Sequence, residues 1–321
     1  MPRLTLLGSI RHFRCVITTW ASGFWLGTVS RVSTPAFLAL PEGVRDRRLS
    51  TSRGEFAALE AGPGDGPLVL LVPGWTGSKE DYIAVLAPLA QAGYHALALD
   101  QRGQYETPGT GREADYTLLA LAADLAAVVE HSADPSLGIH LVGHSFGGLV
   151  ARSAVVGHPE LAASLTLLCS GPAAIPTDRR PLLQAMADAI PAIGLQATWE
   201  AKRAYERSLG APEVPHEIER FLERRFLSND PVSLRTMTQH LIFAPDEVDA
   251  LAAAGVPTLV AFGDTDDGWP PDLQVEMAHR LGARLAVIEQ AGHSPAVERP
   301  RETVATLTDF WAVSQPASWV P

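Results

Sequence analysis

Residues 139–148, Ile-His-Leu-Val-Gly-His-Ser-Phe-Gly-Gly, combine a short apolar run with a Gly-x-Ser-x-Gly turn centred on Ser145. The run predicts a strand, and the residues from Phe146 onward predict a helix. Glycine on both sides lets a strand reverse sharply into a helix, because Cβ atoms have no room beside the central residue. Ser145 would then stand clear of the sheet, facing the free N–H groups of the helix start. We interpret it as a candidate nucleophile.

A serine hydroxyl is a weak nucleophile until a base takes its proton, and the base needs an acid to orient it. Both residue types occur later in the chain. Three aspartates follow the apolar run 256–262, and His293 follows the run 284–289. The three are Asp264, Asp266 and Asp267. Because open α/β sheets place their sites at the carboxyl ends of strands, these side chains are expected to converge with Ser145. Composition alone does not choose among the aspartates.

Apolar runs alternate with helical patterns over most of the chain. Strands are predicted over 45–51, 54–60, 68–72, 94–99, 139–142, 163–168, 256–262 and 284–289. Helices are predicted over 78–92, 118–131, 146–158, 271–281 and 300–313. This alternation predicts an α/β fold, a mostly parallel twisted sheet of about eight strands with helices on both faces. The first two strands have the pattern of an antiparallel hairpin at a sheet edge.

Residues 173–254 interrupt this alternation with helical patterning and no clear strand. Six prolines are expected to divide the segment into several short helices: Pro181, Pro191, Pro212, Pro215, Pro231 and Pro245. The interruption falls at the carboxyl end of a strand, before the last two strands, so we interpret it as a helical lid over the site. A structural decoration is the alternative. The predicted domains are a leader over 1–44, a catalytic domain over 45–172 and 255–321, and the lid.

The N-terminal segment places Arg3, Arg11 and Arg14 before the apolar stretch from Cys15 to Val29. The pattern loosely resembles a secretion signal, but the stretch is short for a membrane span and no Ala-x-Ala site follows. A non-globular leader, a weak export signal and a wrongly chosen start codon remain open. We expect no ordered structure here and a cytoplasmic protein, with export as the alternative.

The composition of the 321-residue chain, 46% hydrophobic and 19% charged, is ordinary for a soluble globular protein. A formal net charge of −11 without a basic run argues against a nucleic-acid partner. Cys15, Cys169 and the ten scattered histidines show no zinc-ligand spacing. We therefore expect neither a disulfide framework nor a structural metal.

From about Arg45 to the C-terminus, the chain resembles lid-bearing serine hydrolases of the α/β-hydrolase superfamily, of the esterase and lipase type. The resemblance rests on the Gly-His-Ser-Phe-Gly-Gly turn, a Gly-x-x-Asp-x-x-x-Pro loop and Ala-Gly-His before the last helix. It implies that Ser145 is the nucleophile and His293 the base. The register of the loop from Gly263 to Pro270 implies that Asp266 is the acid.

The resemblance also implies an oxyanion hole made by the backbone amides of Phe146 and Trp75. Trp75 lies in a loop that usually begins His-Gly in the family, but Pro73 replaces the histidine here and removes its supporting hydrogen bonds. The stretch from Asp100 to Tyr105 resembles the family pattern Asp-x-Arg-Gly-x-Gly, with Tyr105 in place of the final glycine. We interpret Asp100 and Arg102 as structural.

The implied activity is hydrolysis of a carboxylic ester or related acyl bond of a small molecule through an acyl-enzyme, with no cofactor. An acyltransferase, lactonase, carbon–carbon-bond hydrolase or perhydrolase on the same triad is the alternative, as is a non-catalytic ligand receptor. We expect an apolar acyl pocket and no stable membrane span. Six apolar positions are candidates either to line the pocket or to pack the lid: Phe221, Phe226, Met237, Leu241, Ile242 and Phe243.

Overall fold

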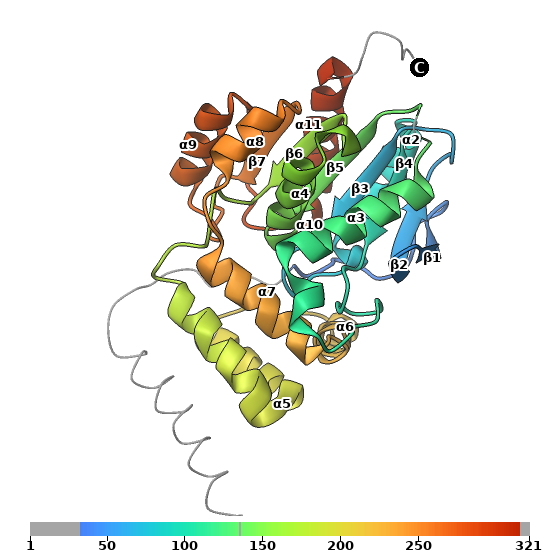
Figure 1. Ribbon diagram of the computed structural model, residues 1–321. Helices are drawn as coiled ribbons and strands as arrows, with labels where there is room; N and C mark the ends of the chain where they lie inside the picture. The colour runs from blue at the N-terminus through green and yellow to red at the C-terminus, as the bar shows by residue number, and fades with distance from the viewer. Residues whose placement is uncertain (1–32, 135, 315–321) are drawn as a thin grey trace, which may run out of the picture.

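The computed structural model describes residues 33–134 and 136–314 (Figure 1). The charged and apolar parts of the predicted leader, with Cys15, lie outside the described residues. The strands are β1 Arg45–Thr51, β2 Gly54–Ala61, β3 Leu68–Val72, β4 His95–Leu99, β5 Ile139–His144, β6 Ser164–Leu168, β7 Thr258–Gly263 and β8 Arg284–Ile288. They form one eight-stranded sheet in the order β1-β2-β4-β3-β5-β6-β7-β8. Only the β1–β2 and β2–β4 pairs are antiparallel, which confirms the predicted mostly parallel sheet.

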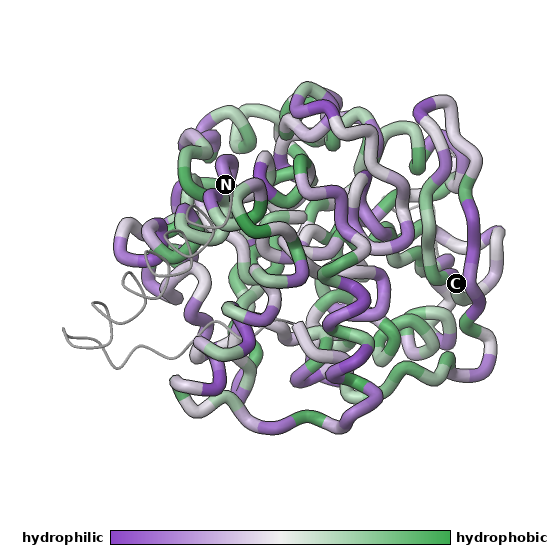
Figure 2. Tube along the Cα trace, turned by 90° about the horizontal axis from the view of Figure 1, so that it is seen from below, coloured by the Kyte–Doolittle hydropathy of each residue, from purple (hydrophilic) through white to green (hydrophobic). Residues whose placement is uncertain are grey.

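Helices cover both faces of the sheet because the central strands are apolar on both faces. In β3, Leu68, Leu70 and Val72 pack toward one face, whereas Val69 and Leu71 pack toward the other. The first face is covered by α3 Leu118–Ser132, α4 Phe146–Gly157, α8 Val248–Ala254 and α9 Pro271–Leu281. The second is covered by α2 Ile83–Gln91, α10 Pro295–Glu298 and α11 Pro300–Ser314. Hydrophobic and hydrophilic residues alternate along the helical turns of the trace, as expected for elements with one buried side (Figure 2).

The described residues also include three 3₁₀ turns: η1 Lys79–Tyr82, η2 Glu113–Tyr116 and η3 Pro159–Leu161. The predicted helix over 78–92 therefore begins as a 3₁₀ turn. Ser78 forms its N-cap, and Asp81 accepts the return bond from the Ser78 amide in a capping box. The short helix α10 was not predicted.

Between β6 and β7, the chain forms α5 Arg180–Ser208, α6 His216–Leu227 and α7 Pro231–Phe243 before α8. We call α5, α6 and α7 the inserted helices; they gather beyond one end of the sheet (Figure 1). The prediction that Pro191 divides α5 is wrong, because the helical path breaks at Gly194 instead. Gly194 has a φ of 78°, a conformation that glycine adopts without the steric cost of a Cβ atom.

Helix α7 is tied to the core at its first turn. The Asp230 carboxylate caps the helix by accepting from the Val232 amide, and it also accepts from the Gly111 amide, both at 2.8 Å. The hydroxyl of Tyr116 donates to the same carboxylate at 2.5 Å. Among the inserted helices, α7 therefore has a polar anchor on the loop that follows β4.

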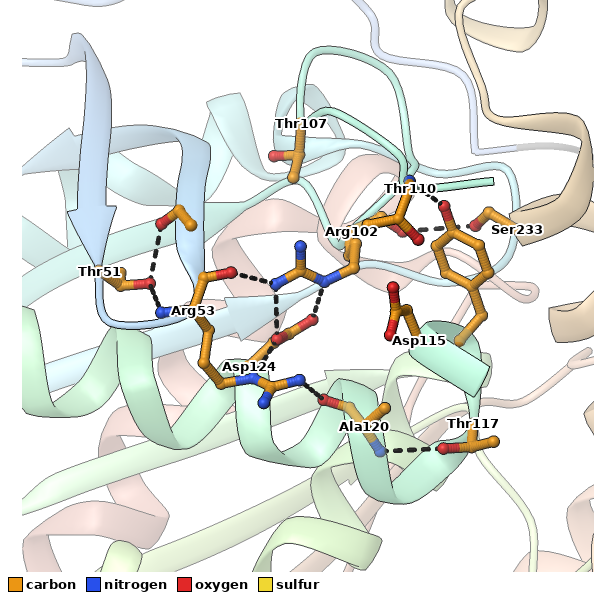
Figure 3. A network of polar contacts seen from close by, with 12 residues as sticks. Thr51, Arg53, Arg102, Thr107, Thr110, Asp115, Thr117, Ala120, Asp124 and Ser233 are labelled. Atoms are coloured by element: carbon orange, nitrogen blue, oxygen red, sulfur yellow. Dashed lines mark hydrogen bonds and ion pairs between the residues drawn. The ribbon is translucent and has the colours of Figure 1, made fainter. Parts of the chain in front are cut away.

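The loop after β4 is itself held by buried charges. The Arg102 guanidinium donates to both carboxylate oxygens of Asp124, at 2.6 and 2.7 Å, and Arg53 donates to the same carboxylate (Figure 3). Asp100, which is fully buried, accepts from the backbone amide of Lys79 at 2.7 Å and from its ammonium at 3.1 Å. These contacts agree with the structural interpretation of Asp100 and Arg102.

The described part of the predicted leader, from Ser33, contacts the rest of the protein. The Ser33 hydroxyl lies 2.7 Å from that of Ser294, and the Ser33 carbonyl accepts from Arg225 of α6 at 2.7 Å. Leu38 packs against the apolar cluster of the inserted helices. This end of the segment over 1–44 therefore joins α6 to the core rather than standing apart from them. Among the described helices, none is long and apolar enough to cross a bilayer.

Candidate active site

Ser145 occupies the tight turn between β5 and α4. Its φ of 53° and ψ of −120° are sparsely populated for a residue with a side chain, so the packing around the turn must hold it there. A Cβ atom on Gly143 would lie 2.4 Å from the Gly147 carbonyl, and one on Gly147 would lie 2.5 Å from the Pro73 carbonyl. The two glycines are therefore required by close backbone approach, as the sequence predicted.

The structure brings three of the predicted site residues into one hydrogen-bonded chain. Nε2 of His293 lies 3.0 Å from Oγ of Ser145, and Nδ1 of His293 lies 2.7 Å from Oδ1 of Asp266. Asp264 is exposed, and Asp267 pairs with Arg179 at 3.7 Å. Of the three neighbouring aspartates, Asp266 is the one that bonds to the His293 ring.

Asp266 is buried and held in its ionised form. Burial alone would raise the pKa of its carboxyl, but His293 and the hydrogen bonds from Gly268 and Gln274 bring that pKa below its usual value. The Gly268 amide donates to Oδ1 at 2.8 Å, and the Gln274 amide group donates to Oδ2 at 2.6 Å. A Cβ atom on Gly268 would lie 2.2 Å from the imidazole, so the bare glycine leaves the room that the ring occupies.

The pKa of His293 is shifted in the opposite direction to that of Asp266. Burial lowers the pKa of its imidazole, but the Asp266 carboxylate outweighs burial and leaves the pKa raised. Because Nδ1–H must donate to the carboxylate, Nε2 of the neutral ring is free to accept the proton of Ser145. The ring is thus oriented and ready to act as a base.

His144, directly before Ser145, is a second histidine at the site but cannot act as the base. Its Nε2 lies 2.6 Å from the carbonyl of His293, and since a carbonyl only accepts, the Nε2–H donates. Burial, reinforced by the charge of His293, lowers the pKa of His144 to about 3. His144 therefore stays neutral and holds the His293 backbone. Sequence reasoning missed this role, although the residue lies inside the turn motif.

The loop after β3 that carries Trp75 is supported by two glutamines. The buried side-chain amides of Gln101 and Gln104 donate to the carbonyls of Pro73 and Gly74, at 2.8 and 2.9 Å. These bonds supply support that a proline in place of the family's histidine cannot give. The sequence contained the signal, since both glutamines lie in the pattern from Asp100 to Tyr105, but it gave no direction for their side chains.

The two predicted oxyanion donors keep their backbone amides available. The loop closes as a turn in which the Gly77 amide donates to the Gly74 carbonyl at 3.1 Å. The first residue of α4, Phe146, has no partner for its amide within the helix. Among the described residues, neither the Trp75 amide nor the Phe146 amide donates a hydrogen bond to another residue. Both donors are thus free for a ligand.

Cys169, directly after β6, lies behind the site. Its Sγ and the nearest ligand atoms of Asp266 and His293 all fall within 4.8 Å of one another. Burial raises the pKa of the thiol well above its usual value, so the sulfur stays protonated and is a poor nucleophile and a poor metal ligand. The sequence offered no sign of this proximity, because the three residues follow three different strands.

A serine on a strained strand-to-helix turn, bonded to a histidine and through it to an aspartate on a mostly parallel sheet, is characteristic of the serine hydrolases built on an α/β fold. The model of the alpha/beta hydrolase family matches residues 69–306. The chain belongs to that family, which confirms the predicted superfamily and fold class.

Relatives agree with this assignment. A protein of Variovorax paradoxus that bears the provisional name carbamate hydrolase RutD is 31% identical over 269 residues, covering 79% of this chain and 96% of the relative. The pimeloyl-[acyl-carrier protein] methyl ester esterase of Aeromonas hydrophila is 25% identical over 256 residues, covering 77% and 96%. A carboxylesterase structure from Nitrososphaera gargenis shares the fold with a TM-score of 0.68 and 22% identity, covering 84% of this chain and 98% of that one. The prediction of a hydrolytic enzyme is confirmed.

Proposed function

We propose that the protein hydrolyses carboxylic esters of small molecules through an acyl-enzyme on Ser145. The observation that carries this proposal is the continuous hydrogen-bonded chain from Ser145 through His293 to Asp266, with links of 3.0 and 2.7 Å. Both links have the length that proton transfer and ring orientation require before any substrate binds.

In the proposed reaction, Oγ of Ser145 attacks the ester carbonyl while Nε2 of His293 takes its proton. The amides of Trp75 and Phe146 stabilise the resulting oxyanion. The imidazolium, balanced by the Asp266 carboxylate, gives its proton to the leaving alcohol. Water then attacks the acyl-enzyme with His293 again as the base, releasing the acid and restoring the serine.

The substrate's acyl group is proposed to be apolar. An apolar cluster of the inserted helices contains Phe221 and Phe226, and Trp75 and Tyr105 of the core pack against it. The rings of Tyr105 and Phe221 meet edge to face, with centroids 5.7 Å apart. We propose that the acyl chain enters here, with the inserted helices acting as the lid.

The six apolar positions that the sequence suggested for the pocket or the lid differ in where they pack. Met237 and Leu241 pack into the core of the sheet, and Ile242 is buried. Phe243 is 67% exposed. Phe221 and Phe226 are therefore the two of the set that we assign to the acyl pocket.

A panel of p-nitrophenyl esters of increasing acyl length tests the proposal. We expect kcat/KM to rise about threefold or more with each added methylene until the pocket is filled, because each buried methylene contributes about 0.8 kcal/mol. Lactones, thioesters, carbamates and methyl esters in the same panel separate related chemistries, and an added alcohol acceptor reveals acyl transfer. Saturable binding of esters without any turnover would contradict the proposal and favour a ligand receptor.

Ester turnover is expected to fall toward acid pH with a midpoint above about 6.5, the ordinary pKa of histidine. Only neutral His293 accepts the serine proton, and Asp266 raises the pKa at which the ring becomes protonated. The measurement is kcat/KM against pH for the wild type and for Asp266→Asn. Removing the carboxylate charge should move the midpoint to lower pH. A flat profile between about pH 5 and 8 would rule out a histidine base.

A further inference from the structure

Arg225 of α6 is a buried arginine that the proposed reaction does not use. Its side chain is 1% exposed, although it belongs to an inserted helix. One arm, Nη1, donates to Oδ1 of Asp81 at 2.7 Å, and the other, Nη2, donates to the Ser33 carbonyl at 2.7 Å. A single guanidinium thus joins α6 to η1 and to the N-terminal segment.

Asp81, the partner of Nη1, lies against the end of the loop that carries Trp75. Its Oδ2 accepts from the Ser78 amide at 3.3 Å. A Cβ atom on Gly77, the last residue of that turn, would lie 2.6 Å from the same oxygen. Asp81 therefore contacts the segment that sets the position of the Trp75 amide.

Ser33, the partner of Nη2, contacts the loop that carries the proposed base, His293. Its hydroxyl lies 2.7 Å from the hydroxyl of Ser294, the residue directly after His293. Ser33, Asp81, His144 and Ser294 line one crevice. The two residues that Arg225 binds therefore each contact a catalytic loop: Asp81 contacts the loop of Trp75, and Ser33 contacts the loop of His293.

We propose that Arg225 is a positioning residue that makes the productive placement of the oxyanion loop and of the His293 loop depend on α6 being seated on the core. When α6 lifts to admit substrate, the guanidinium leaves Asp81 and Ser33, and both loops lose a restraint. When it returns, the site is completed around the bound ester. The inference rests on the proposed function.

The alternative role for the pair is stability alone, and the two roles make different predictions. Removing one partner of a buried ion pair is strongly destabilising because it leaves a buried charge uncompensated, whereas replacing both partners by neutral residues often restores stability. Burial raises the pKa of Asp81 to about 6 even with Arg225 against it, so an unpaired Asp81 is costly to keep ionised. A double substitution therefore separates stability from positioning.

The experiment compares Arg225→Met with the double variant Asp81→Asn/Arg225→Met in the full chain, measuring the melting temperature together with kcat and KM on p-nitrophenyl acetate. We expect Arg225→Met to lower both the melting temperature and kcat. The double variant should recover the melting temperature but keep kcat about 10- to 100-fold below wild type, since small misplacements of catalytic groups cost up to about 10². Recovery of kcat together with the melting temperature overturns the proposal.

Arg203→Met is the matched control. Arg203 pairs with Glu219 at 2.5 Å and so joins α5 to α6 without touching either catalytic loop. Its loss should lower the melting temperature and leave kcat within about threefold of wild type. A fall in kcat as large as that of the double variant would show that any weakening of the inserted helices acts alike, and would overturn a specific role for Arg225.

Ser33→Ala tests the contact with the His293 loop. The variant should fold normally, because it removes only one hydroxyl. We expect kcat to fall about three- to tenfold with an unchanged melting temperature. An unchanged kcat overturns the claim that Ser33 positions the His293 loop through Ser294. Hydrolysis by the wild type, lost in Ser145→Ala, is measured first, so that failure of the proposed function is distinguished from failure of this inference.

Discussion

Ser145→Ala is expected to fold normally and to lose ester turnover by a factor on the order of 10⁵–10⁶. The substitution removes the attacking oxygen, which lies 3.0 Å from Nε2 of His293. Since the members of such a triad act as a unit, the remaining histidine and aspartate cannot compensate. The fold should survive because only one oxygen is lost from a residue whose backbone the surrounding glycines already accommodate. The measurement is kcat on one p-nitrophenyl ester, with circular dichroism to check folding.

Ser170→Ala is the matched control for this loss. Ser170 is also a buried serine after a central strand, but its hydroxyl has no hydrogen-bond partner among the described residues. Its removal should change kcat by less than about threefold. Turnover by Ser145→Ala within about tenfold of the wild type would contradict the assignment of the nucleophile.

Asp266→Asn is expected to lower kcat by up to about 10⁴, a loss of the size known for the corresponding change in a serine protease. The substitution keeps the shape of the side chain but presents an amide in place of a carboxylate 2.7 Å from Nδ1 of His293. The amide favours the wrong tautomer of the ring and leaves the transient imidazolium without a balancing charge. The measurement is kcat of the folded variant on the same ester.

Its two neighbours provide the controls. Asp264 is exposed, and Asp267 pairs with Arg179 and makes no hydrogen bond to the imidazole. Asp264→Asn and Asp267→Asn should each cost about tenfold or less. If either of these variants loses most of its kcat while Asp266→Asn keeps a kcat near that of the wild type, the assignment of the acid is wrong.

The strand pattern and the turn at Ser145 were predictable because their causes are local. Strands buried on both faces require continuous apolar runs, such as 68–72, and the strained turn requires small residues at fixed positions. The placement of Asp266 was predictable only through the register of a family motif, since composition treats three nearby aspartates alike.

The parts that could not be predicted depend on contacts between distant residues. Arg225 and Asp81 are 144 positions apart, and nothing in the charged pattern of α6 marks one arginine as buried. The supporting bonds of Gln101 and Gln104 likewise depend on where their side chains point. In α5, Pro191 suggested a break that occurs at Gly194 instead, where the φ of 78° is a conformation that glycine adopts without the steric cost of a Cβ atom.

The central claim, that Ser145 is the nucleophile of a serine hydrolase, is tested most directly by locating a fluorophosphonate adduct. The wild type is treated with the reagent at neutral pH, digested, and its peptides are sequenced by mass spectrometry. We predict one adduct, on Oγ of Ser145, and no labelling of Ser145→Ala. An adduct on another residue, or undiminished labelling of the alanine variant, would contradict the claim.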